Sequence, residues 1–87
     1  MPLPREYQHQ LNRWAAKGGK TARKRTLKRI NTFYDACQVK YPTQIGKRHV
    51  HDFLNQDMAE TTRRDYWYAI RQFWQLLGRG DPPRYQG

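Results

Sequence analysis

Apolar residues recur at helical spacing in two segments of the first half of the chain. In residues 4–17 the apolar positions fall at i, i+4 and i+7, and a Gly-Gly pair follows, so a helix is predicted that ends at the glycines. Residues 21–40 predict a second, longer helix that stops before Pro42. The two stripes are Tyr7, Leu11 and Trp14 in the first segment and Leu27, Ile30, Tyr34, Cys37 and Tyr41 in the second, with Phe33 at the edge.

The second half of the chain predicts two more helices, over about 47–56 and 61–77. Thr62 and Asp65 have capping-box spacing near the start of the last helix, and Gly78 closes it. Residues 79–87 are rich in Gly and Pro and are expected to be irregular, and no segment alternates with the period of a strand. These elements predict an all-α fold, a compact four-helix bundle that forms a single domain over residues 1–87. Its core is expected to include Leu11, Trp14, Leu27, Ile30, Tyr34, Val50, Phe53, Ile70, Phe73, Trp74 and Leu77.

The charge balance is the most unusual feature of the composition. The chain has 87 residues, with 17 Lys and Arg against 7 Asp and Glu, which gives a formal net charge of +10. Three Trp, six Tyr and three Phe argue against disorder, because disordered chains are poor in aromatic residues. A small, folded and strongly basic domain is expected to bind polyanions.

The cations concentrate in residues 17–29, which hold seven Lys and Arg and no acid. Like charges at i and i+4 destabilise a helix, so this cluster is costly unless a polyanion neutralises it. A second basic group opens the last helix, where free N–H groups suit phosphate, and a weaker third group opens the third helix. The residues predicted to bind DNA are Lys17, Lys20, Thr21, Lys24, Arg25, Lys28, Arg29, Lys47, Arg48, Thr61, Thr62, Arg64 and Tyr68.

No set of residues with catalytic or metal-binding spacing is found. Cys37 is the single cysteine, so it forms no intramolecular disulfide, and its place on an apolar stripe favours a buried structural thiol over a nucleophile. His49 and His51 would point roughly 200° apart on a helix, which argues against a shared metal. The sequence therefore predicts a protein that is not an enzyme and that uses no cofactor or metal. It shows no secretory signal and no apolar run long enough to span a membrane, so a cytoplasmic protein is expected, associated with the nucleoid when bound to DNA.

The last two helices carry a pattern found in a known family. In the last helix, Thr62 is followed by Ala69-Ile70-Arg71-Gln72-Phe73-Trp74 and Leu77, and then by Asp81-Pro82. The third helix contributes Ile45, Gly46, His49, Val50, Phe53 and Leu54. This arrangement resembles the core-binding, SAM-like domain of tyrosine recombinases, the phage integrases and Xer-type proteins, over nearly the whole chain. Gly46 stands where the family usually has Thr, His49 where it often has Asp, and the aromatic residue one turn into the second helix is missing.

The resemblance implies a DNA-clamping domain without the catalytic domain, as a free-standing protein or an excised domain, because the family's catalytic residues are absent from this chain. It also implies a link to DNA integration, recombination and mobile elements, with the second and last helices approaching double-stranded DNA. A recombinase or a second copy of the chain is a further possible partner. Two alternatives stay open: a small basic RNA-binding helical protein, and a protein-interaction adaptor for an acidic partner.

Overall fold

Helices form almost all of the regular structure in the computed structural model, which describes residues 3–82 and leaves out the side chain of Lys20. The elements are α1 (Arg5–Ala16), α2 (Lys20–Cys37), the short 3-10 helix η1 (Pro42–Gln44), α3 (Lys47–Leu54) and α4 (Glu60–Leu76). No strand occurs within residues 3–82. Within this range the predicted all-helical architecture with four α-helices is confirmed.

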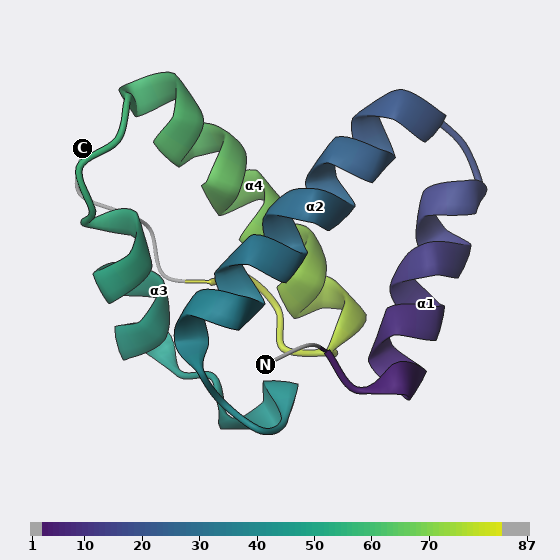
Figure 1. Ribbon diagram of the computed structural model, residues 1–87, viewed down its shortest axis with the longest axis horizontal. Coiled ribbons are helices and arrows are strands. Elements are labelled where there is room, and N and C mark those ends of the chain that lie inside the picture. The colour runs from purple at the N-terminus through teal and green to yellow at the C-terminus, as the bar shows by residue number, and fades with distance from the viewer. Residues whose placement is uncertain (1–2, 83–87) are drawn as a thin grey trace.

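Helix α2 is the centre of the packing (Figure 1). It crosses α4 and contacts α1 and α3 as well, with α1 on one side and α3 on the other. Because α2 is covered from several sides, the arc of it that becomes buried is wider than a single stripe. Phe33, predicted at the edge of the stripe, is fully buried, and its ring meets that of Phe53 edge to face at 5.2 Å.

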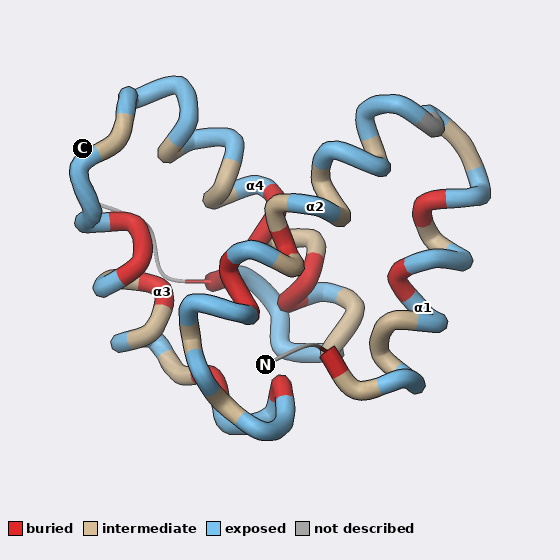
Figure 2. Tube along the Cα trace, in the orientation of Figure 1, coloured by how far each residue is buried: buried red, intermediate tan, exposed pale blue. Residues whose placement is uncertain are grey.

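The predicted core is mostly confirmed, as the buried segments of Figure 2 show. Trp14, Leu27 and Leu77 are instead only half-buried. The core also takes in small or flanking residues outside the predicted set. The buried predicted residues are Leu11, Ile30, Tyr34, Val50, Phe53, Ile70, Phe73 and Trp74, and the added ones include Leu3, Phe33, Ile45, Leu54 and Ala69.

The end of α2 differs from the prediction, because the helix stops at Cys37 rather than at residue 40. Gln38 adopts a left-handed conformation with φ of 52°, which turns the chain out of the helix. The Tyr34 hydroxyl shares its one proton between the carbonyls of Val39 and Lys40, both at 3.1 Å, and holds this turn. Tyr41 therefore lies outside the helix and is 48% exposed, so its predicted place on the apolar stripe is wrong.

The other boundaries shift by one or two residues. Helix α3 ends at Leu54 instead of residue 56. Helix α4 begins at Glu60 with Ala59 as its N-cap, which places Thr62 inside the first turn. Thr62 is therefore not the cap of α4, and the predicted capping box with Asp65 is wrong.

Gly78 ends α4 as predicted, through a paired hydrogen-bond motif. Its φ of 72° lets its N–H donate to the carbonyl of Gln75 and the next N–H, of Arg79, donate to Trp74. The Arg79 guanidinium lies 4.4 Å from the Trp74 ring centroid and donates to the Ile45 carbonyl, which ties the chain after α4 to the start of α3. Residues 79–82 are irregular, and the rest of the predicted tail lies outside the described residues. No helix of residues 3–82 combines the length and the apolar character that crossing a membrane requires.

Candidate nucleic-acid interface

The outer face of α2 carries the largest group of predicted binding residues. The core-facing side of this helix buries Ile30, Phe33 and Tyr34, which directs the basic residues of its first half to solvent. Four predicted binding residues are exposed on α2: Thr21, Lys24, Arg25 and Lys28. We call the exposed cations Lys24, Arg25 and Lys28 the α2 strip.

Two predicted residues flank the start of this helix. Lys17 is exposed directly after α1. Lys20 is the first residue of α2, and its side chain lies outside the described part of the structure. The turn between them contains Gly19 with φ of 51°, a conformation that glycine adopts without strain.

Arg29 differs from its neighbours because it faces α4. Its side chain is only 33% exposed, and its Nη2 lies 3.7 Å from Oδ2 of Asp65. Half-exposed pairs of this kind contribute little to stability, about 0–1 kcal/mol. The pair shows that the basic half of α2 lies next to the first half of α4.

Helix α4 adds the second group. Thr61, Thr62 and Arg64 are exposed in its first two turns, and Tyr68 follows Arg64 by one turn with 54% of its surface exposed. Tyr66 of α4 and the α2 residues Arg25, Lys28, Arg29 and Thr32 line one shallow depression. The crossing of α2 and α4 thus brings Arg25, Lys28 and Arg29 next to Tyr66 of α4, whereas the starts of the two helices point apart (Figure 1).

The third predicted group lies apart from the other two. Lys47 and Arg48 are exposed at the start of α3, whereas the opposite end of that helix contacts the start of α4 through Arg63. Eight residues of helix separate these ends by about 12 Å. Arg48 also lies 3.8 Å from the carboxylate of Asp52 on its own helix, which partly offsets its charge.

Two arginines inside the basic runs have structural contacts that the sequence does not reveal. Arg23 donates to the Trp14 carbonyl at 2.7 Å, and its guanidinium lies 4.8 Å from the Trp14 ring centroid. Arg63 donates to the Leu54 carbonyl at 2.7 Å and pairs with Glu60 at 2.7 Å. Each arginine donates to a backbone carbonyl in the last turn of the preceding helix, and the Trp14 carbonyl also accepts the Lys17 N–H at 3.3 Å.

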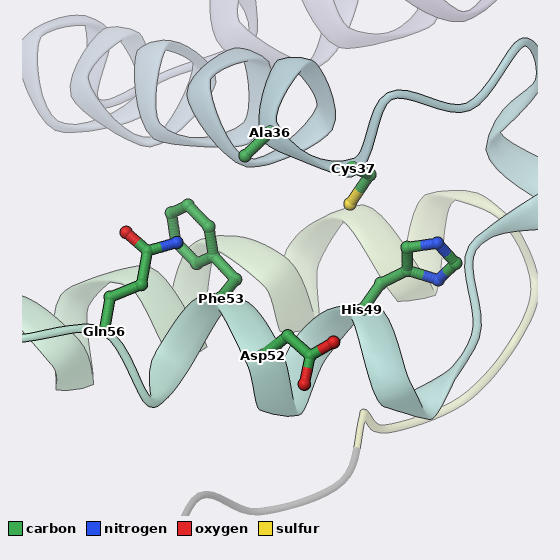
Figure 3. A pocket seen from close by; sticks show the side chains of 6 residues that line it. All are labelled: Ala36, Cys37, His49, Asp52, Phe53 and Gln56. Carbon is green, nitrogen blue, oxygen red and sulfur yellow. The ribbon is translucent and has the colours of Figure 1, made fainter.

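A pocket between the end of α2 and α3 gathers residue types that occur in catalytic sites (Figure 3). Cys37, His49 and Asp52 line it, together with Ala36, Phe53 and Gln56. Burial raises the pKa of the Cys37 thiol to about 12, so it stays protonated at neutral pH. His49 Nδ1 accepts the Gly46 N–H at 2.9 Å, so the neutral ring carries its proton on Nε2 and offers no lone pair there.

In this arrangement His49 makes a structural contact at the start of α3. Cys37 is half-buried rather than buried as predicted, and His49 caps the start of α3. The capping role of His49 is a function that the sequence analysis missed, although its position three residues after Gly46 is the spacing of a reciprocal cap. Among the described residues, no group of three or more His, Cys, Asp and Glu side chains is placed to hold a metal ion.

The residues that carry the family resemblance are largely core residues. Ala69, Ile70, Phe73 and Trp74 are buried in α4, and Val50 is buried in α3. Their pattern reflects how the helices pack, and the predicted binding residues lie on the opposite faces. Comparison of the chain with protein-family models, with curated proteins and with solved structures finds no match.

Proposed function

We propose that this chain is a non-enzymatic double-stranded DNA-binding module that grips DNA through α2 and α4. The observation that carries the proposal is the exposed α2 strip, whose Arg25 and Lys28 line one depression together with Tyr66 of α4. Lys24, Arg25 and Lys28 stand in a segment without a single acid, from Lys17 to Arg29, on a face that the core does not use. A phosphate backbone would remove the repulsion among these charges.

The shape of the surface favours a duplex over other polyanions. Helix α2 has 18 residues and is about 27 Å long, so its basic half is a rigid rod of the diameter that the DNA major groove admits. The free N–H groups at the start of α4, next to Thr61, Thr62 and Arg64, offer further phosphate contacts. Phosphate contacts from two crossing helices would fix the orientation of the domain on the duplex.

The finer part of the proposal is a SAM-like arrangement as in the core-binding domain of tyrosine recombinases. It is supported by the order and lengths of the helices and by the motif of the last two helices. In that family the second and last helices approach DNA, and the exposed basic residues of this chain lie on the corresponding helices. A role in the cytoplasm on nucleoid DNA, in integration or recombination, belongs to the same proposal.

The test is a titration of duplex DNA at several salt concentrations. If about five phosphates are neutralised, log K is expected to fall with log salt at a slope of about −4 to −5. Single-stranded DNA and RNA of equal length serve as competitors. Stronger competition by RNA would favour the RNA-binding alternative, and the absence of salt-dependent binding to all three would favour the adaptor.

A further inference from the structure

A second depression lies between α1, α2 and α4. It has a volume of about 240 Å³, below the roughly 300–1,000 Å³ of pockets that enclose drug-sized ligands, so it suits a single small ring system. We call it the aromatic depression. Its lining residues are Trp14, Thr26, Tyr68, Arg71, Gln72 and Gln75.

The aromatic depression differs from the α2 strip in charge. Arg71 is the one cationic residue that lines it, and its Nε donates to Oδ1 of Asp81 at 3.1 Å. The Arg71 guanidinium also lies 6.0 Å from the Trp67 ring centroid. The ion pair offsets the charge of Arg71, so the depression suits an uncharged occupant rather than a phosphate.

Tyr68 gives the depression an exposed ring with a defined orientation. Its ring is 54% exposed and meets the Trp67 ring edge to face, with centroids 5.3 Å apart and planes at 78°. Gln72 and Gln75 follow Tyr68 at i+4 and i+7 and share its helix face. Each amide offers two donors and an acceptor, so a stacking surface and hydrogen-bonding groups lie together.

From this combination we propose that the aromatic depression holds one unpaired nucleobase of a DNA strand whose phosphates lie on the α2 strip. A base is flat, uncharged and edged with donors and acceptors, which matches the ring and amides of the depression. Arg25 of the strip and Thr26 of the depression are consecutive residues of α2, whose side chains point about 100° apart, so the two surfaces lie on neighbouring faces of this helix. This inference rests on the proposed function and adds a preference for DNA with an extruded base.

The experiment compares two duplexes that differ by one base. One is fully paired, and the other carries a single bulged 2-aminopurine, whose fluorescence reports stacking. The bulged duplex is expected to bind about 5- to 150-fold more tightly, with quenched fluorescence, because stacking on an aromatic side chain is worth about 1–3 kcal/mol per base. Tyr68→Ala should bring this ratio close to 1, and Tyr68→Phe should retain it.

The matched control is Tyr41→Ala, since Tyr41 is the other exposed tyrosine of residues 3–82, and it lies after α2 and does not line the depression. It should keep the wild-type ratio. Equal, salt-dependent binding of both duplexes by the wild type would overturn the nucleobase site and leave the proposed function intact. The absence of salt-dependent binding of either duplex would overturn both the nucleobase site and the proposed function. If Tyr68→Ala kept the preference for the bulged duplex, the base would bind elsewhere. Tighter binding of RNA that carries the same 2-aminopurine would overturn the assignment to DNA.

Discussion

The two ends of α2 differ in whether their side chains face solvent or are held by burial and hydrogen bonds within the fold. At the first end, Lys24, Arg25 and Lys28 project into solvent. At the last end, the Cys37 thiol is held protonated by burial, and the Tyr34 hydroxyl donates to two carbonyls that fix the next turn. The residue types near the last end are those of many catalytic sites, yet the Cys37 thiol is protonated and His49 Nδ1 already accepts a hydrogen bond from Gly46.

This contrast shows that the protonation, burial and hydrogen bonds of a side chain decide what it can do more than its residue type does. In the pocket of Figure 3, His49 and Asp52 are directed to Gly46 and Arg48. The cations of the α2 strip carry no chemistry of their own, but their full charge faces outward. Binding a polyanion needs only this charge, whereas acid-base catalysis would need His49 released from its cap.

The largest expected effect concerns the reactivity of Cys37. Because a pKa of about 12 leaves little thiolate, alkylation by iodoacetamide at pH 8 is expected to be on the order of 100-fold slower in the folded protein than in urea. Because burial raises this pKa, the free energy of unfolding is higher below about pH 9, and it falls as the pH rises toward about 12. Mass spectrometry of timed samples measures the rate. Equal alkylation rates in the folded protein and in urea would mean that the side chains at the last end of α2 are as accessible as those at the first end.

The double variant Arg25→Glu and Lys28→Glu tests the first end. We expect duplex affinity to fall at least tenfold, about 1.4 kcal/mol, and the salt slope to shrink by about 2 for two lost phosphate contacts. The melting temperature should stay the same or rise slightly, since like-charge repulsion along α2 is removed. Unchanged affinity at low salt, with the fold intact, would place the DNA on another face.

Arg23→Ala is the matched control for this variant, because Arg23 lies in the same basic run but faces the core side. Its loss leaves the Trp14 carbonyl without its guanidinium donor and removes the contact with the Trp14 ring. The free energy of unfolding is expected to fall by about 1–2 kcal/mol, or about 4–8 °C in melting temperature per kcal/mol. The salt slope of DNA binding should not change.

The sequence predicts the faces of the helices well because periodicity alone sets them. It left Arg23 out of the predicted binding residues but could not show what Arg23 contacts, since the carbonyl that Arg23 meets belongs to another helix and is brought there by tertiary packing. The stop at Gln38 was missed for a similar reason, because a non-glycine residue with positive φ gives no local signal. For the candidate site, the outward cations were predictable, whereas the pairing of Arg29 with Asp65 depends on how α2 crosses α4.

The smallest expected effect concerns Asp65, the acid that the crossing places beside the basic half of α2. Asp65→Asn removes a carboxylate that would repel phosphate and releases Arg29, whose Nη2 lies 3.7 Å from it. We expect duplex affinity to rise about two- to fivefold and the salt slope to grow by up to about 1, as one more cation becomes available. Stability should change by less than about 0.5 kcal/mol, because the pair is half-exposed. Fluorescence anisotropy at two salt concentrations measures both quantities. A fall in affinity would show that Asp65 holds Arg29 in its binding orientation. The basic half of α2 would then also depend on a contact within the fold.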